Sequence, residues 1–202
     1  AGVKSRILIL GYTKPANYRQ RPWKKLPFDY TVFDLASAQA LNRWQKGSRV
    51  HLFVDTGMCR EGVTLAELPS FLTELKQLKN LQLVGLASHL ADADNPKNQD
   101  FTQLQIANFK QALQLLQQHG FVPQWRHLSA SAGTLKITDP VFNLCRVGLA
   151  NYGLSPLAKT ERRQKNIYLR PALEFRTHIA QIKTIHRGDK VSYNGTYTAK
   201  KK

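Results

Sequence analysis

Several arginines and histidines in this sequence follow closely on short apolar runs, where side chains of these types often do chemistry. Arg60 comes soon after the run 50–54, His89 follows the run 81–87, and Arg146 lies within 143–147. Arginine is a permanent cation that binds anions, and histidine can move protons near neutral pH. Each alone is more often structural, so the candidate site rests on their grouping.

Small residues follow two of the later runs. Ser131 lies within Ser129-Ala130-Ser131-Ala132-Gly133, and Gly148 and Leu149 follow Val147. Backbone N–H groups in such turns can approach a phosphate closely, and a serine hydroxyl can bind one. The two turns are candidates for a phosphate site, although a serine at such a place is also a common helix N-cap.

A tyrosine near the C-terminus is a further candidate for catalysis. Tyr193 lies in the segment Val191-Ser192-Tyr193-Asn194-Gly195-Thr196-Tyr197. A phenol has an ordinary pKa of about 10, so it needs a nearby cation or hydrogen-bond donor to act as a base at neutral pH. The same segment is also typical of a tyrosine that only packs in a strand.

The apolar runs predict alternating strands and helices around a parallel sheet. No Gly-rich dinucleotide fingerprint follows any strand, which favours an α/β (β/α)8 TIM-type barrel over an open doubly wound sheet. The predicted strands are 7–10, 30–33, 50–54, 81–87, 125–128 and 143–147, and the predicted helices are 36–45, 65–78 and 99–119.

The barrel interpretation also numbers the strands. Phosphate commonly binds in the loops after barrel strands seven and eight. If those strands are the ones near Leu128 and Arg146, the chain holds about strands 3–8, and the first two lie upstream of Ala1. After Gly153 the pattern becomes polar and basic, and 172–185 then alternates like an antiparallel strand. We therefore predict a partial barrel over 1–155, followed over 156–202 by a linker and the beginning of a β-rich domain.

Composition favours a globular cytoplasmic protein. The chain has 202 residues, 42% of them hydrophobic, and no stretch approaches the ~20 apolar residues of a membrane helix. The net charge is +17, but the basic residues are scattered without an interleaved aromatic pattern, so we expect no nucleic-acid or membrane partner.

The two cysteines, Cys59 and Cys145, lack zinc-type spacing. This favours reduced thiols and no metal site, with a disulfide as the alternative.

Five segments, in order and with compatible spacing, resemble the motifs of alanine racemases, which are pyridoxal-phosphate-dependent amino acid racemases of fold type III. The resemblance covers nearly the whole chain and implies interconversion of L- and D-alanine, which supplies D-alanine for peptidoglycan. The segments are Asp55 to Gly62 (D-T-G-M-x-R-x-G), Ser88 to Asp94 (T-H-x-A-x-A-D), His127 to Ala132 (H-x-A-N-S-A), Arg146 to Leu154 (R-x-G-I-x-x-Y-G-L) and Gly188 to Ala199 (G-x-x-V-S-Y-x-x-T-Y-x-A).

The resemblance implies how these residues would bind the cofactor, pyridoxal 5'-phosphate. Arg146 would face its pyridine nitrogen and keep that nitrogen unprotonated, which favours simple reprotonation at Cα over transamination. Ser131 would bind the phosphate through its hydroxyl, and Gly148 and Leu149 would bind it through their backbone N–H groups.

The resemblance also implies the catalytic residues. Tyr193 would be the base that exchanges the Cα proton of L-alanine, acting in the active site of the partner subunit of a homodimer. His89 would hydrogen-bond that tyrosine. Arg60 would contact the phenolic oxygen of the cofactor and lie near the substrate carboxylate.

The sequence departs from the family pattern at several places. The cofactor-binding lysine, in a V-K-A-x-A-Y-G-H-G segment, has no counterpart in 1–202, and since it is also the second base, this chain alone should be inactive. Phe53 stands where many members carry a carbamylated lysine, so another anion such as chloride would hold Arg60. Ala130 stands where Asn is usual, and Cys59 where Gly is common.

Two other functions stay open at this point. The missing segments shape the substrate pocket, so the parent protein could racemise serine or another small amino acid instead. A catalytically dead barrel that only binds pyridoxal phosphate is the second alternative. The sequence upstream of Ala1 would separate an enzyme from a binding module.

Overall fold

The computed structural model describes residues 4–19 and 28–201. The chain forms two compact units, Ala1–Ala172 and Leu173–Lys202. The larger unit contains all the residues that the sequence assigned to a barrel, and the smaller one contains Tyr193.

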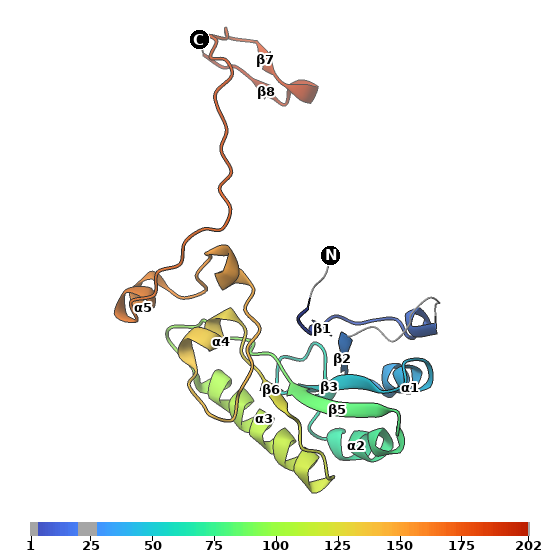
Figure 1. Cartoon of the computed structure of the whole chain (residues 1–202). Helices are drawn as coiled ribbons and strands as arrows, with labels where there is room; N and C mark the ends of the chain where they lie inside the picture. Colours follow the sequence, from blue (N-terminus) through green and yellow to red (C-terminus); the bar gives the residue numbers. More distant parts are fainter. Residues whose placement is uncertain (1–3, 20–27, 202) are drawn as a thin grey trace. The chain divides into compact units, whose positions relative to one another are not determined.

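The first unit is built on a curled parallel sheet (Figure 1). Its strands are β1 (Ile7–Ile9), β2 (Phe28–Val32), β3 (Ser48–Asp55), β5 (Leu81–Ala87) and β6 (Trp125–His127), in that order across the sheet, and β4 (Val63–Thr64) pairs with the end of β3. Every pairing in this sheet is parallel. This confirms the predicted parallel α/β fold and fits an incomplete TIM-type barrel.

Three amphipathic helices lie along one side of this sheet, α1 (Leu35–Trp44), α2 (Leu68–Gln77) and α3 (Asp100–Gln118) (Figure 1). The carboxylate of Asp34 caps α1 by accepting the backbone N–H of Ser37 at 2.7 Å. The main apolar core lies between these helices and the sheet, where alternate strand residues meet the helices. It includes these fully buried residues: Val32, Val50, Leu52, Leu86, Leu41, Leu72 and Phe109.

The segment 143–147 is not a strand, so that prediction was wrong. It runs extended beside β6, and the N–H of Asn143 donates to the carbonyl of Arg126 at 3.1 Å. The N–H of Arg126 in turn donates to a side-chain atom, Oδ1 of Asn143, at 2.8 Å, and not to a backbone carbonyl. An asparagine side chain in place of a backbone carbonyl interrupts the ladder of hydrogen bonds.

Short helices complete the first unit after β6. α4 (Ser131–Lys136), η2 (Leu149–Tyr152) and α5 (Lys159–Gln164) follow one another, and η1 (Pro15–Arg19) lies between β1 and β2. Lys136 and Glu161 form an ion pair at 3.0 Å, which joins α4 to α5.

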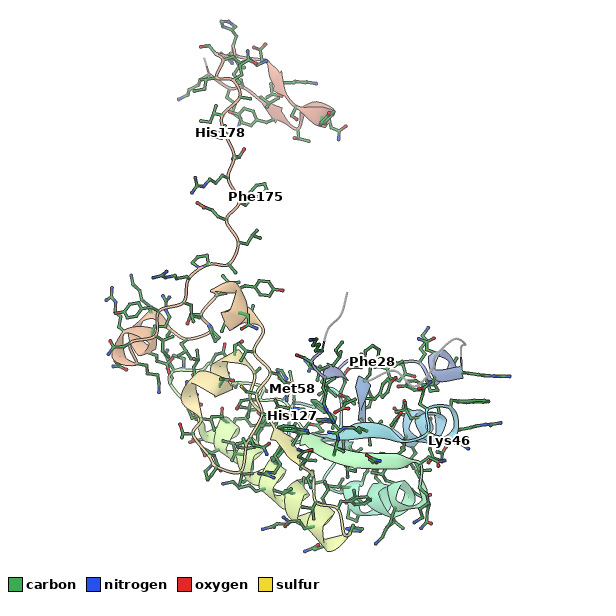
Figure 2. All side chains as sticks on the ribbon, in the orientation of Figure 1. Phe28, Lys46, Met58, His127, Phe175 and His178 are labelled. Atoms are coloured by element: carbon green, nitrogen blue, oxygen red, sulfur yellow. The ribbon has the colours of Figure 1, made fainter. Side chains whose placement is uncertain are left out.

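The second unit contains a small antiparallel hairpin of β7 (Lys190–Val191) and β8 (Tyr197–Thr198), with η3 (Tyr193–Gly195) between them. The strand predicted over 172–185 does not form: no described strand pairs with this segment, and an isolated extended segment lacks the ladder that defines a strand. Its apolar side chains are exposed, among them Phe175, which is labelled in Figure 2, and Ile182. The boundary between 155 and 156 stays a prediction.

Among the described residues, no helix is long and apolar enough to span a membrane. In the same part of the chain, no group of three or more His, Cys, Asp or Glu side chains is placed to hold a metal ion. Cys59 and Cys145 are both exposed free thiols.

Candidate active site

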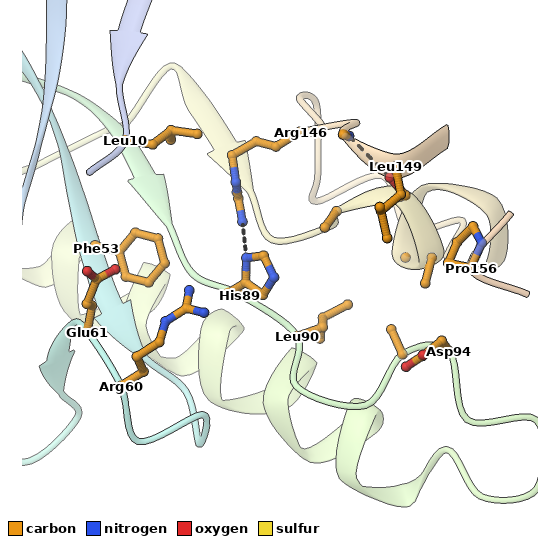
Figure 3. Close-up of a pocket in the computed structure, with 16 residues that line it drawn as sticks. Leu10, Phe53, Arg60, Glu61, His89, Leu90, Asp94, Arg146, Leu149 and Pro156 are labelled. Carbon is orange, nitrogen blue, oxygen red and sulfur yellow. Dashed lines mark hydrogen bonds between the residues drawn. The ribbon is translucent and has the colours of Figure 1, made fainter. Parts of the chain in front are cut away.

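A pocket of about 490 Å³ opens where the parallel strands end (Figure 3). Its lining comes from the loops that follow β3, β5 and β6, and its size is ordinary for a small-molecule site. The fold brings to this pocket six of the seven residues that the sequence proposed for a site, namely Arg60, His89, Ser131, Arg146, Gly148 and Leu149. Their individual roles stay predictions.

Arg146 is a half-buried cation whose guanidinium is surrounded by neutral acceptors. Its Nη1 donates to Nδ1 of His127 at 2.7 Å and to the carbonyl of the same residue at 3.1 Å. Its Nη2 donates to the carbonyl of Ser88 at 2.6 Å. Burial lowers the pKa of Arg146 to about 10, with the charge of Arg60 acting in the same direction. Arg146 therefore stays charged at neutral pH and adds positive potential to the pocket.

His89 also contacts the guanidinium of Arg146. Nη2 of Arg146 also lies 3.2 Å from Nδ1 of His89, a contact shown in Figure 3. Burial lowers the pKa of His89, and the positive charges of Arg146 and Arg60 lower it further. His89 is therefore a neutral ring at physiological pH, which can accept or relay a proton but carries no charge of its own.

A tight loop after β3 carries Arg60. Oδ1 of Asp55 accepts the N–H groups of Gly57 at 2.8 Å and Cys59 at 3.2 Å, which closes the loop just before Arg60. Cys59 has a φ of 54°, in the left-handed region that favours glycine. The backbone therefore explains why Gly is common at this position in the family motif.

Phe53 and Glu61 flank Arg60 at the pocket (Figure 3). The ring of Phe53 is 8% exposed, so this wall of the pocket is apolar where a carbamylated lysine would be charged. Within residues 4–19 and 28–201, no acidic group lies within 4.0 Å of the Arg60 guanidinium. Chloride or another anion at this place stays a prediction.

Ser131 joins the two turns proposed for phosphate binding. Its Oγ accepts the N–H of Gly148 at 3.2 Å and of Ala150 at 3.3 Å. Ser131 is the first residue of α4, and the N-cap position belongs to Ala130, which makes no side-chain cap bond. The alternative of Ser131 as an N-cap is therefore wrong, and an Asn in place of Ala130 would supply the missing cap.

Tyr193 lies in the second unit, at the start of η3 in the hairpin turn. It is 92% exposed, so it is not a packed strand residue. An exposed phenol at a hairpin tip is free to contact another surface, but its meeting with the pocket stays a prediction.

Sequence reasoning gave no role to three buried polar residues beneath the pocket, Asp29, His51 and His127. Nδ1 of His51 lies 2.8 Å from Nε2 of His127, and Nε2 of His51 lies 3.5 Å from Oδ2 of Asp29. A period-two signal could have found them, because side chains alternate between the faces of a strand. In β3 the polar Arg49 and His51 alternate with Val50 and Leu52 of the apolar core.

A family model for the N-terminal domain of alanine racemase matches residues 1–156. This chain belongs to the alanine racemase family. An alanine racemase of Geobacter sp. (strain M21) is 34% identical over 98% of this chain and 53% of its own length. One of Symbiobacterium thermophilum is 35% identical over 98% of this chain and 52% of its own length.

Solved structures of alanine racemases have the same fold. The Bacillus anthracis alanine racemase with bound L-Ala-P matches with a TM-score of 0.84 and 32% identity, over 98% of this chain and 52% of that one. The chain spans about half the length of the curated relatives that it matches.

The residues of the pocket fit the cofactor that the family uses. Arg60 and Arg146 bring two positive charges, and the Ser131 hydroxyl lies with backbone N–H groups of the 148–150 turn in one small cluster. Positive charge and clustered donors suit a phosphate and a phenolate. The pocket as built can therefore accept pyridoxal phosphate.

Proposed function

We propose that the protein containing this chain is an alanine racemase that uses pyridoxal 5'-phosphate and supplies D-alanine for peptidoglycan. The observation that carries the proposal is the convergence of Arg60, His89, Ser131 and Arg146 on one pocket at the carboxyl ends of the strands, in a chain of this family. We further propose that the protein is cytoplasmic and acts as a homodimer.

Three groups of the pocket would hold the cofactor. Ser131 and the N–H groups of Gly148 and Leu149 would bind its phosphate, Arg146 would donate toward its pyridine nitrogen, and Arg60 would contact its phenolic oxygen. The bound cofactor supplies an electron sink for the carbanion that forms when Cα loses a proton. A guanidinium remains a donor at neutral pH, so Arg146 would keep the pyridine nitrogen unprotonated and restrain that sink.

The substrate would be held and deprotonated by residues of two subunits. Arg60 would lie near the carboxylate of alanine, since it is a cation at the pocket wall. Tyr193 of one subunit would take the Cα proton of L-alanine in the pocket of the other, where His89 would hydrogen-bond its hydroxyl. A neutral His89 beside the Arg146 cation is suited to assist a phenol that must lose its proton.

The remaining architecture is proposed from the same resemblance. The strands of the larger unit would be about strands 3–8 of a closed barrel, and residues 156–202 would begin a β-rich second domain. The lysine that the family uses has no counterpart in 1–202, so we propose that this chain by itself is inactive.

The test uses a full-length form, meaning a protein that contains this chain and has the length of its relatives. Purified with added pyridoxal phosphate, it should gain visible absorbance and interconvert L- and D-alanine, measured by polarimetry. L-Serine is the parallel substrate, and faster turnover of serine would move the proposal to a serine racemase. A colourless protein that leaves both amino acids optically unchanged would overturn it.

A further inference from the structure

Three buried polar residues and the half-buried Arg146 form one line of contacts at the floor of the pocket. It runs from Asp29 on β2 to His51 on β3, His127 on β6 and Arg146, with separations of 3.5, 2.8 and 2.7 Å. The residues Asp29, His51 and His127 are 6%, 2% and 0% exposed. The line therefore lies away from solvent, where polar groups must be matched donor to acceptor.

The chemistry of arginine fixes the direction of the two hydrogen bonds in this line. A guanidinium can only donate, so Nδ1 of His127 must accept from Arg146. A neutral His127 then carries its proton on Nε2 and donates it to Nδ1 of His51. A neutral His51 in turn carries its proton on Nε2, the atom that faces the carboxylate of Asp29.

The surroundings keep both rings neutral, as this order requires. Burial lowers the pKa of His127 to about 3, and the charge of Arg146 lowers it further. Burial is also the largest influence on His51 and lowers its pKa, against the opposing charge of Asp29. A second proton on His127 would point an N–H at the guanidinium, so the geometry and the burial agree.

The sheet itself makes room for His51. Gly85 on β5 lies opposite, and a Cβ atom there would stand 2.1 Å from Nδ1 of the His51 ring. The pairing of β3 with β5 also shifts register between Val50 and His51. An ordinary packed position would need neither feature, since glycine and a register shift both weaken a strand.

We propose that Asp29 and His51 are positioning residues for Arg146. His51 accepts from Nε2 of His127 and so holds that ring with Nδ1 toward the guanidinium, and this acceptor holds Arg146 in its orientation at the pocket. Since Nδ1 of His89 accepts from the same guanidinium, the proton of His89 lies on Nε2 as well. The inference rests on the proposed function only for its effect on turnover, because the proton positions can be measured without any reaction.

The first experiment is ¹⁵N NMR of histidine-labelled full-length form, without substrate. We expect His51, His127 and His89 each to show a protonated Nε2 and an unprotonated Nδ1 between about pH 6 and 8. A proton on Nδ1 of His127, or a doubly protonated ring there, would overturn the inference whatever the activity of the protein.

The second experiment compares two substitutions of His51. Gln can still accept from His127 and donate toward Asp29, whereas Leu has a similar volume and can do neither. We expect His51→Leu to weaken the hydrogen bond from Arg146 to Nδ1 of His127, seen as a shift of that ¹⁵N resonance toward the value of a free acceptor nitrogen. It should also lower kcat about tenfold, with KM for alanine within about twofold. His51→Gln should keep the Nδ1 resonance in place and kcat within about threefold of the unsubstituted protein.

Two further variants serve as an independent disturbance of the His51 ring and as a control. Gly85→Ala should shift the Nδ1 resonance of His127 as His51→Leu does, because the new methyl group displaces the His51 ring. Asp139→Asn removes the acid of a separate ion pair with Lys110 and should change nothing. An unchanged Nδ1 resonance of His127 in His51→Leu and Gly85→Ala would refute the positioning role, and so would an equal loss of kcat in His51→Leu and His51→Gln.

Discussion

Ser131 accepts the backbone N–H of Gly148 at 3.2 Å, and this contact brings together the two turns that follow β6 and the extended segment 143–147. The same hydroxyl also accepts from Ala150. A serine that gathers N–H groups around itself prepares the site at which those groups would meet a phosphate.

Ser131→Ala should therefore weaken the binding of pyridoxal phosphate to the full-length form. A hydrogen bond to a charged group is worth about 1.5–3 kcal/mol, so the Kd should rise by roughly 10-fold to 150-fold. Titration followed by visible absorbance measures the Kd. Ser70→Ala removes an exposed hydroxyl on α2 and serves as the control. Equal affinities for the two variants would show that Ser131 does not hold the phosphate.

The second prediction concerns the strained loop before Arg60. Cys59 occupies a φ of 54°, which costs a residue with a Cβ about 1–2 kcal/mol, whereas glycine adopts it freely. Glycine also loses more entropy on folding, so we expect Cys59→Gly to raise the free energy of unfolding by a net ~0.5–1 kcal/mol. Urea unfolding of the full-length form measures it. Cys145→Ala is the control for loss of a thiol, and a lower urea midpoint for Cys59→Gly would contradict the strain.

The two buried histidines give a pH dependence of stability. Burial lowers the folded-state pKa of His127 from the usual histidine value of 6.5 to about 3, and it lowers the pKa of His51 as well. Below about pH 6.5 the unfolded chain therefore binds more protons than the folded chain. The stability that comes from keeping the rings neutral is present above that pH and is lost as the pH falls toward 3. His127 should cost about 1.4 kcal/mol per pH unit in this window, and His51 adds to the loss in the same direction.

Urea unfolding of the full-length form at about pH 7.5 and about pH 5.5 measures this slope. His127→Gln should reduce it, and substitution of the exposed His178 should leave it unchanged. A slope that is the same in all three proteins would mean that the buried rings do not set it.

The sequence predicted the elements whose signal is local. The strands near 50–54 and 81–87 and the helices around Leu41, Leu72 and Phe109 carry apolar residues at regular spacing, and all of them form. The strands predicted at 143–147 and 172–185 do not form, because a strand needs a neighbouring strand to pair with and its own composition does not show whether one is present.

The candidate site was partly predictable for the same reason. Arg60, His89 and Arg146 belong to contiguous motifs, and strand ends meet at one edge of a parallel sheet. The line from Asp29 through His51 was missed because its members lie far apart in the chain. Only the register of β2 against β3 and the open space at Gly85 bring those side chains into contact.

The fourth prediction tests the catalytic tyrosine. In the full-length form, Tyr193→Phe should abolish exchange of the Cα proton of L-alanine with solvent and leave exchange from D-alanine in place, because only one of the two bases is removed. The loss should be about 100-fold or more, the ordinary contribution of a general base. Tyr197→Phe, on the neighbouring β8, is the matched control. Equal loss of exchange from both enantiomers, with cofactor binding intact, would argue against the role.

The last prediction is that the 202-residue chain, made alone, does not form a stable and active monomer. β1 and β6 are the end strands of the open sheet, and the segment 143–147 covers β6 only in part. An edge strand such as β1 leaves N–H and C=O groups unpaired. Large apolar side chains beside the pocket are exposed, among them Leu149, Tyr152 and Leu154.

Two further strands with their helices would bury on the order of 1,000 Å² of apolar surface, a gross gain of roughly 25 kcal/mol before chain entropy is subtracted. That gross gain exceeds the ~5–15 kcal/mol net stability of an ordinary domain. Thermal melts and a racemase assay of this chain beside the full-length form measure the difference. A cooperative melt with turnover from the 202 residues would show that the open sheet is sufficient.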